Sequence, residues 1–151
     1  MSTATDQPGT GEIDFLGSPA RILVDGGTAR GAYCLVETSG PRGDMPPLHV
    51  HHADDEAFYV LDGRLTIFVG DRTIDLRAGG CAFAPRGVAH TYRVESESAR
   101  WLAAGSPAGF DAFVRDVGEA GSGGGPAELA EIALRHGIEI LGPPGMLPTT
   151  G

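Results

Sequence analysis

The sequence contains no lysine, and its eleven basic residues are all arginine, against twenty aspartates and glutamates. The formal net charge of −9, without a cluster of basic residues, argues against a nucleic acid or an anionic membrane surface as partner. No apolar run approaches the roughly 20 residues that a membrane-spanning helix needs. The first residues also lack the charged and apolar regions of a signal peptide. We therefore expect a cytoplasmic protein.

Cysteine is scarce as well. Cys34 and Cys81 each lie inside an apolar run, and neither belongs to a CxxC pair. Without a secretion signal, two such residues are expected to be reduced thiols that pack as small hydrophobic side chains.

Helical patterns are missing before residue 107. The chain has the size and composition of one domain with a packed core, with 151 residues, 41% hydrophobic and 21% charged. Short β-rich runs alternate with turn residues instead, as in a sandwich or barrel. Parallel strands would need intervening helices, so the sheets should be mostly antiparallel. The expected strands cover residues 20–24, 32–38, 49–51, 56–61, 64–69, 73–76, 81–84, 90–95 and 101–104.

Helical patterns follow this β-region. Two helices are expected, and the later one begins at Pro126, after a glycine-rich linker (121–125), and ends at Gly137. The organisation is therefore a mobile tail (1–11), a β-domain (12–107) and a helical extension with its own tail (108–151). The first expected helix, 109–117, carries an apolar stripe at i, i+3, i+4 and i+7: Phe110, Phe113, Val114 and Val117. This stripe covers either the mouth of the β-domain or its outer sheet surface.

Three of the five histidines, with one glutamate, have the spacing of metal ligands. Residues two apart on a strand point to the same face, so His49 and His51 would present both imidazoles together. Glu56 opens the next apolar run and His90 opens a later one, so the four side chains could converge from separate strands. Imidazoles with one carboxylate suit a first-row divalent metal that keeps positions open for a substrate.

The polar residues near these ligands have other expected roles. His52 would point to the opposite face of a regular strand, as a surface residue or as a partner of a ligand. Asp54 and Asp55 are expected in a solvated turn. His136, at a helix end, is expected to be a capping or surface residue.

Strand alternation also predicts the walls of a cavity. Phe58 and Val60 share the face of Glu56, and Tyr92 shares the face of His90. Each of these side chains could equally be ordinary core. The full set of candidate substrate-pocket residues is Tyr33, Phe58, Val60, Phe83, Tyr92, Trp101, Phe110 and Phe113. Aromatic and aliphatic walls around one metal would suit an apolar or aromatic substrate.

The two ligand-bearing runs resemble the two motifs of the cupin superfamily, which are small β-barrels. The first motif, G(X)5HXH(X)3–4E(X)6G, is matched at Gly43, His49, His51, Glu56 and Gly63. The second motif, G(X)5PXG(X)2H(X)3N, is matched at Gly79, Pro85, Gly87 and His90, with Val94 in place of the final Asn. The resemblance implies an all-β fold, the antiparallel double-stranded β-helix or jelly-roll cupin barrel, over residues 12–107, followed by short C-terminal helices.

Within that superfamily the chain is similar to small bacterial quercetin 2,3-dioxygenase-like cupins. This resemblance implies a dioxygenase that uses O2 on a flavonol- or polyketide-like aromatic molecule. It implies one divalent transition metal (Fe, Mn, Ni, Co, Cu or Zn) on the four ligands, with Glu56 as the catalytic base. It also suggests a homodimer, because cupins of this size commonly pair through sheet edges, which are a liability when left open.

Other classes of protein remain open. A non-redox isomerase, cyclase or lyase, acting on a polyketide-like or sugar substrate, would use the same ligands as a Lewis-acid site. A non-catalytic protein would bind metal and a small molecule without turnover, and a storage-type structural protein is a further alternative. O2 consumption that depends on a redox-active metal separates the dioxygenase from all of these.

Overall fold

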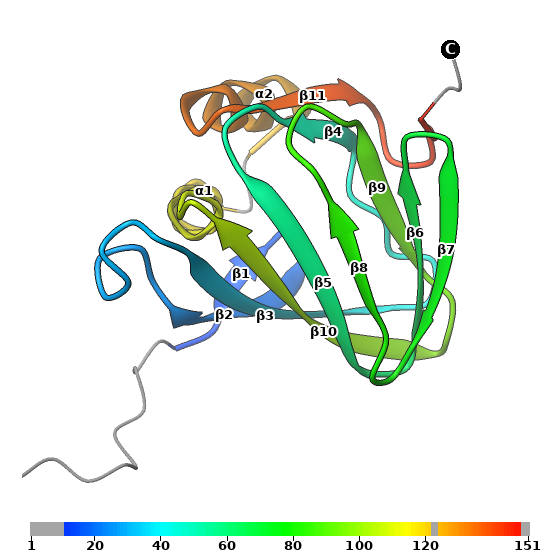
Figure 1. Ribbon diagram of the computed structural model, residues 1–151. Coiled ribbons are helices and arrows are strands. Elements are labelled where there is room, and N and C mark those ends of the chain that lie inside the picture. The colour runs from blue at the N-terminus through cyan, green and yellow to red at the C-terminus, as the bar shows by residue number, and fades with distance from the viewer. Residues whose placement is uncertain (1–10, 122–123, 149–151) are drawn as a thin grey trace, which may run out of the picture.

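The computed structural model describes residues 11–121 and 124–148, which form eleven strands and two helices (Figure 1). The expected N-terminal tail therefore lies outside the described residues except for Gly11, and the expected linker lies partly outside them. The all-β fold with short C-terminal helices is confirmed.

Two antiparallel sheets face each other (Figure 1). The first sheet, in the order β1-β2-β3-β10-β5-β8, consists of β1 (Ile13–Phe15), β2 (Ser18–Val24), β3 (Cys34–Pro41), β5 (Asp55–Asp62), β8 (Cys81–Ala84) and β10 (Ser98–Ser106). The second sheet, in the order β11-β4-β9-β6-β7, consists of β4 (Leu48–His51), β6 (Arg64–Val69), β7 (Arg72–Arg77), β9 (His90–Val94) and β11 (Ile138–Gly142). The two sheets are not hydrogen-bonded into a closed barrel, so the fold is an open jelly roll.

Alternation along the strands fills the space between the sheets. On β10 every second side chain is buried, including Ala99, Trp101 and Ala103. On β5 the same period buries Glu56, Phe58 and Val60. Trp101 and Val60 are fully buried, together with residues of β6 and β9. All nine expected strands are present, with ends that differ by a few residues, and β1 and β11 were not predicted as strands.

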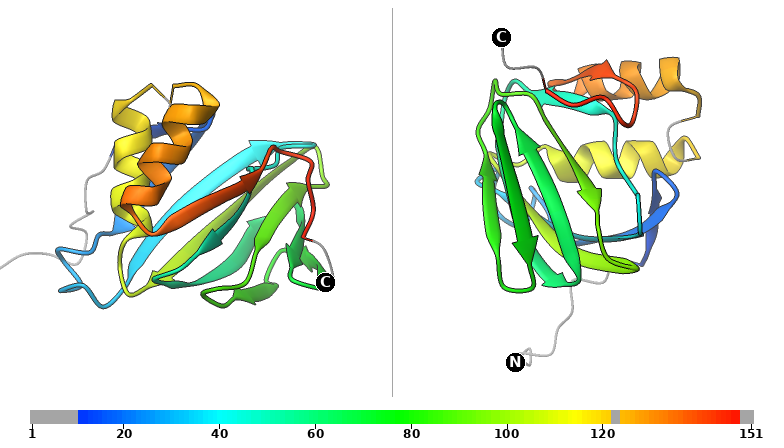
Figure 2. Two further views of the ribbon diagram at one scale, coloured as in Figure 1. Left: turned by 90° about the horizontal axis from the view of Figure 1, so that it is seen from above. Right: turned by 90° about the vertical axis from the view of Figure 1, so that its right-hand side faces the viewer.

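Helices α1 (Phe110–Glu119) and α2 (Pro126–Arg135) lie side by side at one end of the sheets (Figure 2). Helix α1 packs against β1 and β3 through its buried apolar stripe. Its first turn is held by the buried Asp111 carboxylate, which accepts hydrogen bonds from Gly26 N (2.8 Å) and Gly109 N (3.1 Å). Each described helix has ten residues, too few to cross a bilayer.

The second helix returns the chain to the second sheet. After Gly137, β11 pairs antiparallel with β4, with Ile138 opposite His51 and Ile140 opposite His49. Residues from the far end of the chain thus lie beside the strand that carries two candidate ligands, as both views of Figure 2 show.

One expectation about the cysteines is wrong. Cys34 is buried on β3 as expected, but Cys81 is exposed. The reason is the alternation of β8, which turns its neighbour Ala82 inward and Cys81 outward.

Candidate metal centre

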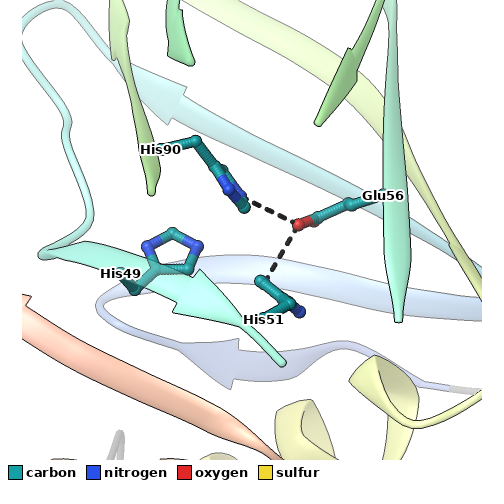
Figure 3. A group of neighbouring side chains, drawn as sticks. All are labelled: His49, His51, Glu56 and His90. Carbon is teal, nitrogen blue, oxygen red and sulfur yellow. Dashed lines mark hydrogen bonds and ion pairs between the residues drawn. The ribbon is translucent and has the colours of Figure 1, made fainter. Parts of the chain in front are cut away.

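Three strands bring the four predicted ligands together (Figure 3). His49 and His51 lie on β4, and His49 is directly opposite His90 on β9, so three imidazoles share the inner face of the second sheet. Glu56 reaches them from β5 in the first sheet. One possible ligand atom from each residue lies within 4.8 Å of all the others, which is close enough for a single cation to contact all four.

The cluster is largely buried and is centred on one carboxylate oxygen. His51, Glu56 and His90 are buried, and His49 is half-buried. His90 Nε2 donates a hydrogen bond to Glu56 Oε2 at 3.1 Å. His51 Nε2 lies 3.1 Å from the same oxygen, at ion-pair distance but outside hydrogen-bond geometry.

Each imidazole is held from behind through its other ring nitrogen. His49 Nδ1 donates to the Pro47 carbonyl at 2.7 Å, and His90 Nδ1 lies 3.5 Å from the Val88 carbonyl. His51 Nδ1 lies 3.2 Å from Asp54 Oδ1 and 3.3 Å from Oδ2. Such contacts on Nδ1 orient the rings and direct each Nε2 at the cluster, where a bound metal would displace the proton that His90 Nε2 shares with Glu56.

The electrostatics of the cluster keep one imidazole neutral and the carboxylate ionised. Burial, with the neighbouring His90 and His51, lowers the pKa of His49 to about 3. Burial opposes the charged form of His51 too, but the carboxylates of Glu56 and Asp54 outweigh it and raise the His51 pKa to about 10. Burial alone would raise the pKa of Glu56, yet the charge on His51 and the hydrogen bond from His90 hold it well below its usual range.

These donors fit a divalent cation. Among the described residues, His51 Nε2 and Trp101 Nε1 are the buried side-chain polar atoms without a hydrogen-bond partner. Leaving such an atom unpaired costs about 1–3 kcal/mol, and a cation between His51, His90 and Glu56 would give it a partner. Three nitrogens and one carboxylate oxygen suit Fe, Mn, Ni, Co, Cu or Zn, and binding would displace the proton of His51.

A small inner cavity of about 40 Å³ adjoins the donors. Four of the predicted pocket residues line it: Phe58, Tyr92, Phe110 and Phe113. Helix α1 therefore contributes two aromatic rings to the cavity wall, which favours the prediction that its apolar stripe covers the mouth of the β-domain.

The other four predicted pocket residues lie elsewhere. Val60 and Trp101 are fully buried in the core between the sheets and do not line the cavity. Tyr33 is 44% exposed and precedes β3, and Phe83 is 54% exposed. Phe83 points outward because its neighbour Ala84 pairs with the inward-facing Glu56.

Sequence reasoning missed the opposite wall of the cavity. Its apolar residues come from β1, α2, β11 and the segment before β4: Phe15, Leu16, Pro46, Pro47, Leu129, Ile138 and Ile140. The only local signal was the Pro46-Pro47 pair just before the histidine strand, because the remaining residues are distant in sequence.

The acidic turn before Glu56 also differs from expectation. Asp54 is buried, 4% exposed, because it lies against His51, whereas Asp55 pairs with Arg86 near the surface. His52 faces outward and pairs with Glu139 at 2.9 Å, away from the cluster.

Comparison with known proteins agrees with this geometry. Residues 35–105 match the model of a cupin domain. Over 99 residues, 66% of this chain, the sequence is 29% identical to quercetin 2,3-dioxygenase of Bacillus subtilis (strain 168), but it spans only 29% of that enzyme's length.

Two solved structures have the same fold. An RmlC-like cupin from Shewanella frigidimarina superposes with a TM-score of 0.58 at 20% identity, covering 73% of this chain and 92% of that one. The polyketide cyclase RemF from Streptomyces resistomycificus gives 0.56 at 22% identity, covering 70% and 80%. With both motifs and the jelly-roll sheets in place, residues 35–105 of the chain form a cupin domain.

Proposed function

We propose that this protein is a metal-dependent dioxygenase of an aromatic, flavonol- or polyketide-like small molecule. The observation that carries the proposal is a buried cluster of three histidines and one ionised glutamate beside an aromatic-walled cavity. The likeness to a quercetin 2,3-dioxygenase over two thirds of the chain supports the choice of reaction.

The chain's own residues account for binding, orientation and proton transfer. When bound, the cation supplies a Lewis acid and, where it is redox-active, the electron chemistry that O2 requires. Phe58, Phe110 and Phe113 form apolar walls that exclude water from the donors, and the small cavity that they line admits no more than one small group of an aromatic substrate, such as a hydroxyl. Glu56 lines the same cavity, and its carboxylate would accept the proton of a substrate hydroxyl as general base.

Metal analysis of the purified full-length chain, followed by oxygen-electrode assays with a flavonol such as quercetin, tests the proposal. We expect one divalent metal per chain and O2 consumption that stops when the metal is chelated. Conversion of an aromatic substrate without O2 uptake would instead indicate a non-redox isomerase, cyclase or lyase, and binding without conversion would indicate a non-catalytic protein.

Two variants separate metal binding from proton transfer. His90→Ala should remove most of the bound metal, because one of four ligands is lost, while the β-sheet circular dichroism stays the same. Glu56→Gln should keep part of the metal but lower turnover at least about 100-fold, since the amide is no base. The matched control is His52→Ala, which removes an exposed histidine that pairs with Glu139. Undiminished turnover in Glu56→Gln would exclude the role as base.

A further inference from the structure

A larger outer chamber of about 590 Å³ adjoins the inner cavity. The two spaces share wall residues from five parts of the chain, among them Phe15, Pro47, Tyr92, Leu129 and Ile140. A molecule that reaches the metal cluster from this side must therefore pass through the outer chamber or leave part of itself there.

The walls of this chamber differ in polarity. Leu129 of α2, Ile140 of β11 and Pro143 form an apolar side. The first sheet contributes two hydroxyls instead, from Ser18 and Thr38, which are only 9% and 6% exposed. No hydrogen bond of either hydroxyl is seen among residues 11–121 and 124–148, and neither oxygen is one of the fully enclosed polar atoms that lack a partner. Both hydroxyls are therefore open to the chamber and available to a ligand there.

A carboxyl group lies next to these hydroxyls. Ala20 pairs with Thr38, so Ser18, two residues before Ala20 on β2, shares the inner face with Thr38 and Gly40 of β3. A Cβ at Gly40 would overlap the carboxylate of Asp44, so the missing side chain leaves the space that Asp44 occupies. Ser18, Thr38 and Asp44 thus lie together on one side of the chamber, which we call its polar edge.

Charge in the chamber is one-sided. Among the described residues that line it there is no arginine or histidine, and Asp44 is the one acidic residue. No described cation pairs with Asp44, and burial raises the pKa of its carboxyl. Tyr92, at the junction with the inner cavity, adds a phenol without a described hydrogen-bond partner. An anionic ligand would lose its hydration here without gaining a counter-charge, whereas a hydroxyl group would find acceptors.

We propose that the outer chamber binds an uncharged, hydroxyl-bearing aromatic molecule with its hydroxyl edge on Ser18, Thr38 and Asp44, and that Asp44 is the residue that selects against anionic ligands. The assignment of this ligand as substrate rests on the proposed function. The binding selectivity itself does not, because it requires neither metal nor turnover.

A matched pair of probes, 2-naphthol and 2-naphthoate, tests this selectivity. Their rings are the same, and they differ in a hydroxyl against a carboxylate. We expect calorimetric titration of the EDTA-treated full-length chain at neutral pH to show 2-naphthol binding about tenfold or more tightly than 2-naphthoate. Asp44→Asn, which preserves shape, should reduce that preference about tenfold. A preference that is unchanged in Asp44→Asn, or the absence of 2-naphthol binding to the wild type, would overturn the proposal.

Two further variants locate the ligand. Leu129→Trp, which fills the chamber from the apolar side, should weaken 2-naphthol binding about tenfold or more, whereas Leu134→Trp, on the same helix but 62% exposed, should leave it unchanged. Thr38→Val, which removes one hydroxyl at nearly constant volume, should weaken binding about threefold to tenfold and keeps the test valid if Leu129→Trp does not fold. Binding that is unaltered in both Leu129→Trp and Thr38→Val would place the ligand elsewhere and contradict the proposal. Because metal content and O2 uptake are measured separately, a failed oxygen-electrode assay would not be confused with a failed titration.

Discussion

At the scale of single residues, Asp54 shows how a site depends on side chains that do not bind the metal themselves. Its carboxylate faces His51 Nδ1 with both oxygens, at 3.2 and 3.3 Å, and it is buried. This contact fixes the ring orientation of His51 and directs Nε2 toward Glu56 and His90. Asp54 therefore positions one of the four candidate ligands.

Replacing Asp54 should lower metal affinity without abolishing it. We expect Asp54→Asn to weaken divalent-metal binding about 10- to 100-fold, measured by competition with a chromophoric chelator. Asp55→Asn is the matched control, because that neighbouring carboxylate pairs with Arg86 instead of a ligand. Equal affinities for the two variants would show that Asp54 does not position His51.

The clustering of the four candidate ligands was predictable from the sequence, but the residues around them were only partly so. His49, His51, Glu56 and His90 follow fixed spacing, and spacing is visible in one dimension. Asp54 looked like part of a solvated turn, because nothing local reveals that the turn folds back onto His51. Phe83 looked like a wall residue from its size, yet the pairing of Ala84 with Glu56 decides its direction.

At the scale of elements, a polar network links β6 and β9, two adjacent inner strands of the second sheet. Thr66 on β6 pairs with Arg93 on β9, and both donate to Glu95: Thr66 Oγ1 at 2.8 Å and Arg93 Nε at 2.7 Å. The hydrogen bond from Arg93 has the larger effect and that from Thr66 the smaller, and together they lower the pKa of Glu95 to about 2.

This network predicts a pH-dependent contribution to stability. Because the folded pKa lies below the ordinary value of 4.5, the stabilisation is present above pH 4.5 and is lost as the pH falls toward 2. We expect Glu95→Gln to lower the free energy of unfolding by up to about 1 kcal/mol at pH 7, with the difference shrinking toward zero near pH 2 to 3. Urea unfolding at several pH values measures it, and the exposed Glu97→Gln is the control. A difference that is constant across that range would contradict the assignment.

The limits of sequence reasoning are different for elements. Nine strands follow from alternation and turn residues, which are local signals. The three residues of β1 are too few to show a period, and β11 is defined by its pairing with β4, almost 90 positions earlier in the sequence. Tertiary pairing, rather than local preference, makes these segments strands.

At the scale of the whole molecule, the candidate ligands join the two sheets. His49, His51 and His90 belong to the second sheet and Glu56 to the first, although no described strand of one sheet pairs with a strand of the other. A cation bound by all four would therefore add a direct link across the core and would favour the folded state over the unfolded one.

Metal should accordingly raise thermal stability. At a free metal concentration about 100 times the dissociation constant, we expect the melting temperature to rise by about 5–10 °C over the EDTA-treated protein. Differential scanning calorimetry measures the shift, which should be lost in His90→Ala and kept in His52→Ala. An equal shift in His90→Ala would mean that the metal binds elsewhere. The homodimer and the cytoplasmic location remain predictions at this scale.

The pairing of β11 with β4 has a consequence for any shortened version of the chain. Strand β4 has four residues and is registered to β9 at one pair, His49 with His90, so most of its lateral support comes from the C-terminal strand. A protein cut after Ser106 would retain all four candidate ligands. It would lose β11, the strand that supports His49 and His51 on β4. A protein trimmed to the cupin domain, residues 35–105, would thus keep all four candidate ligands but bind the metal poorly.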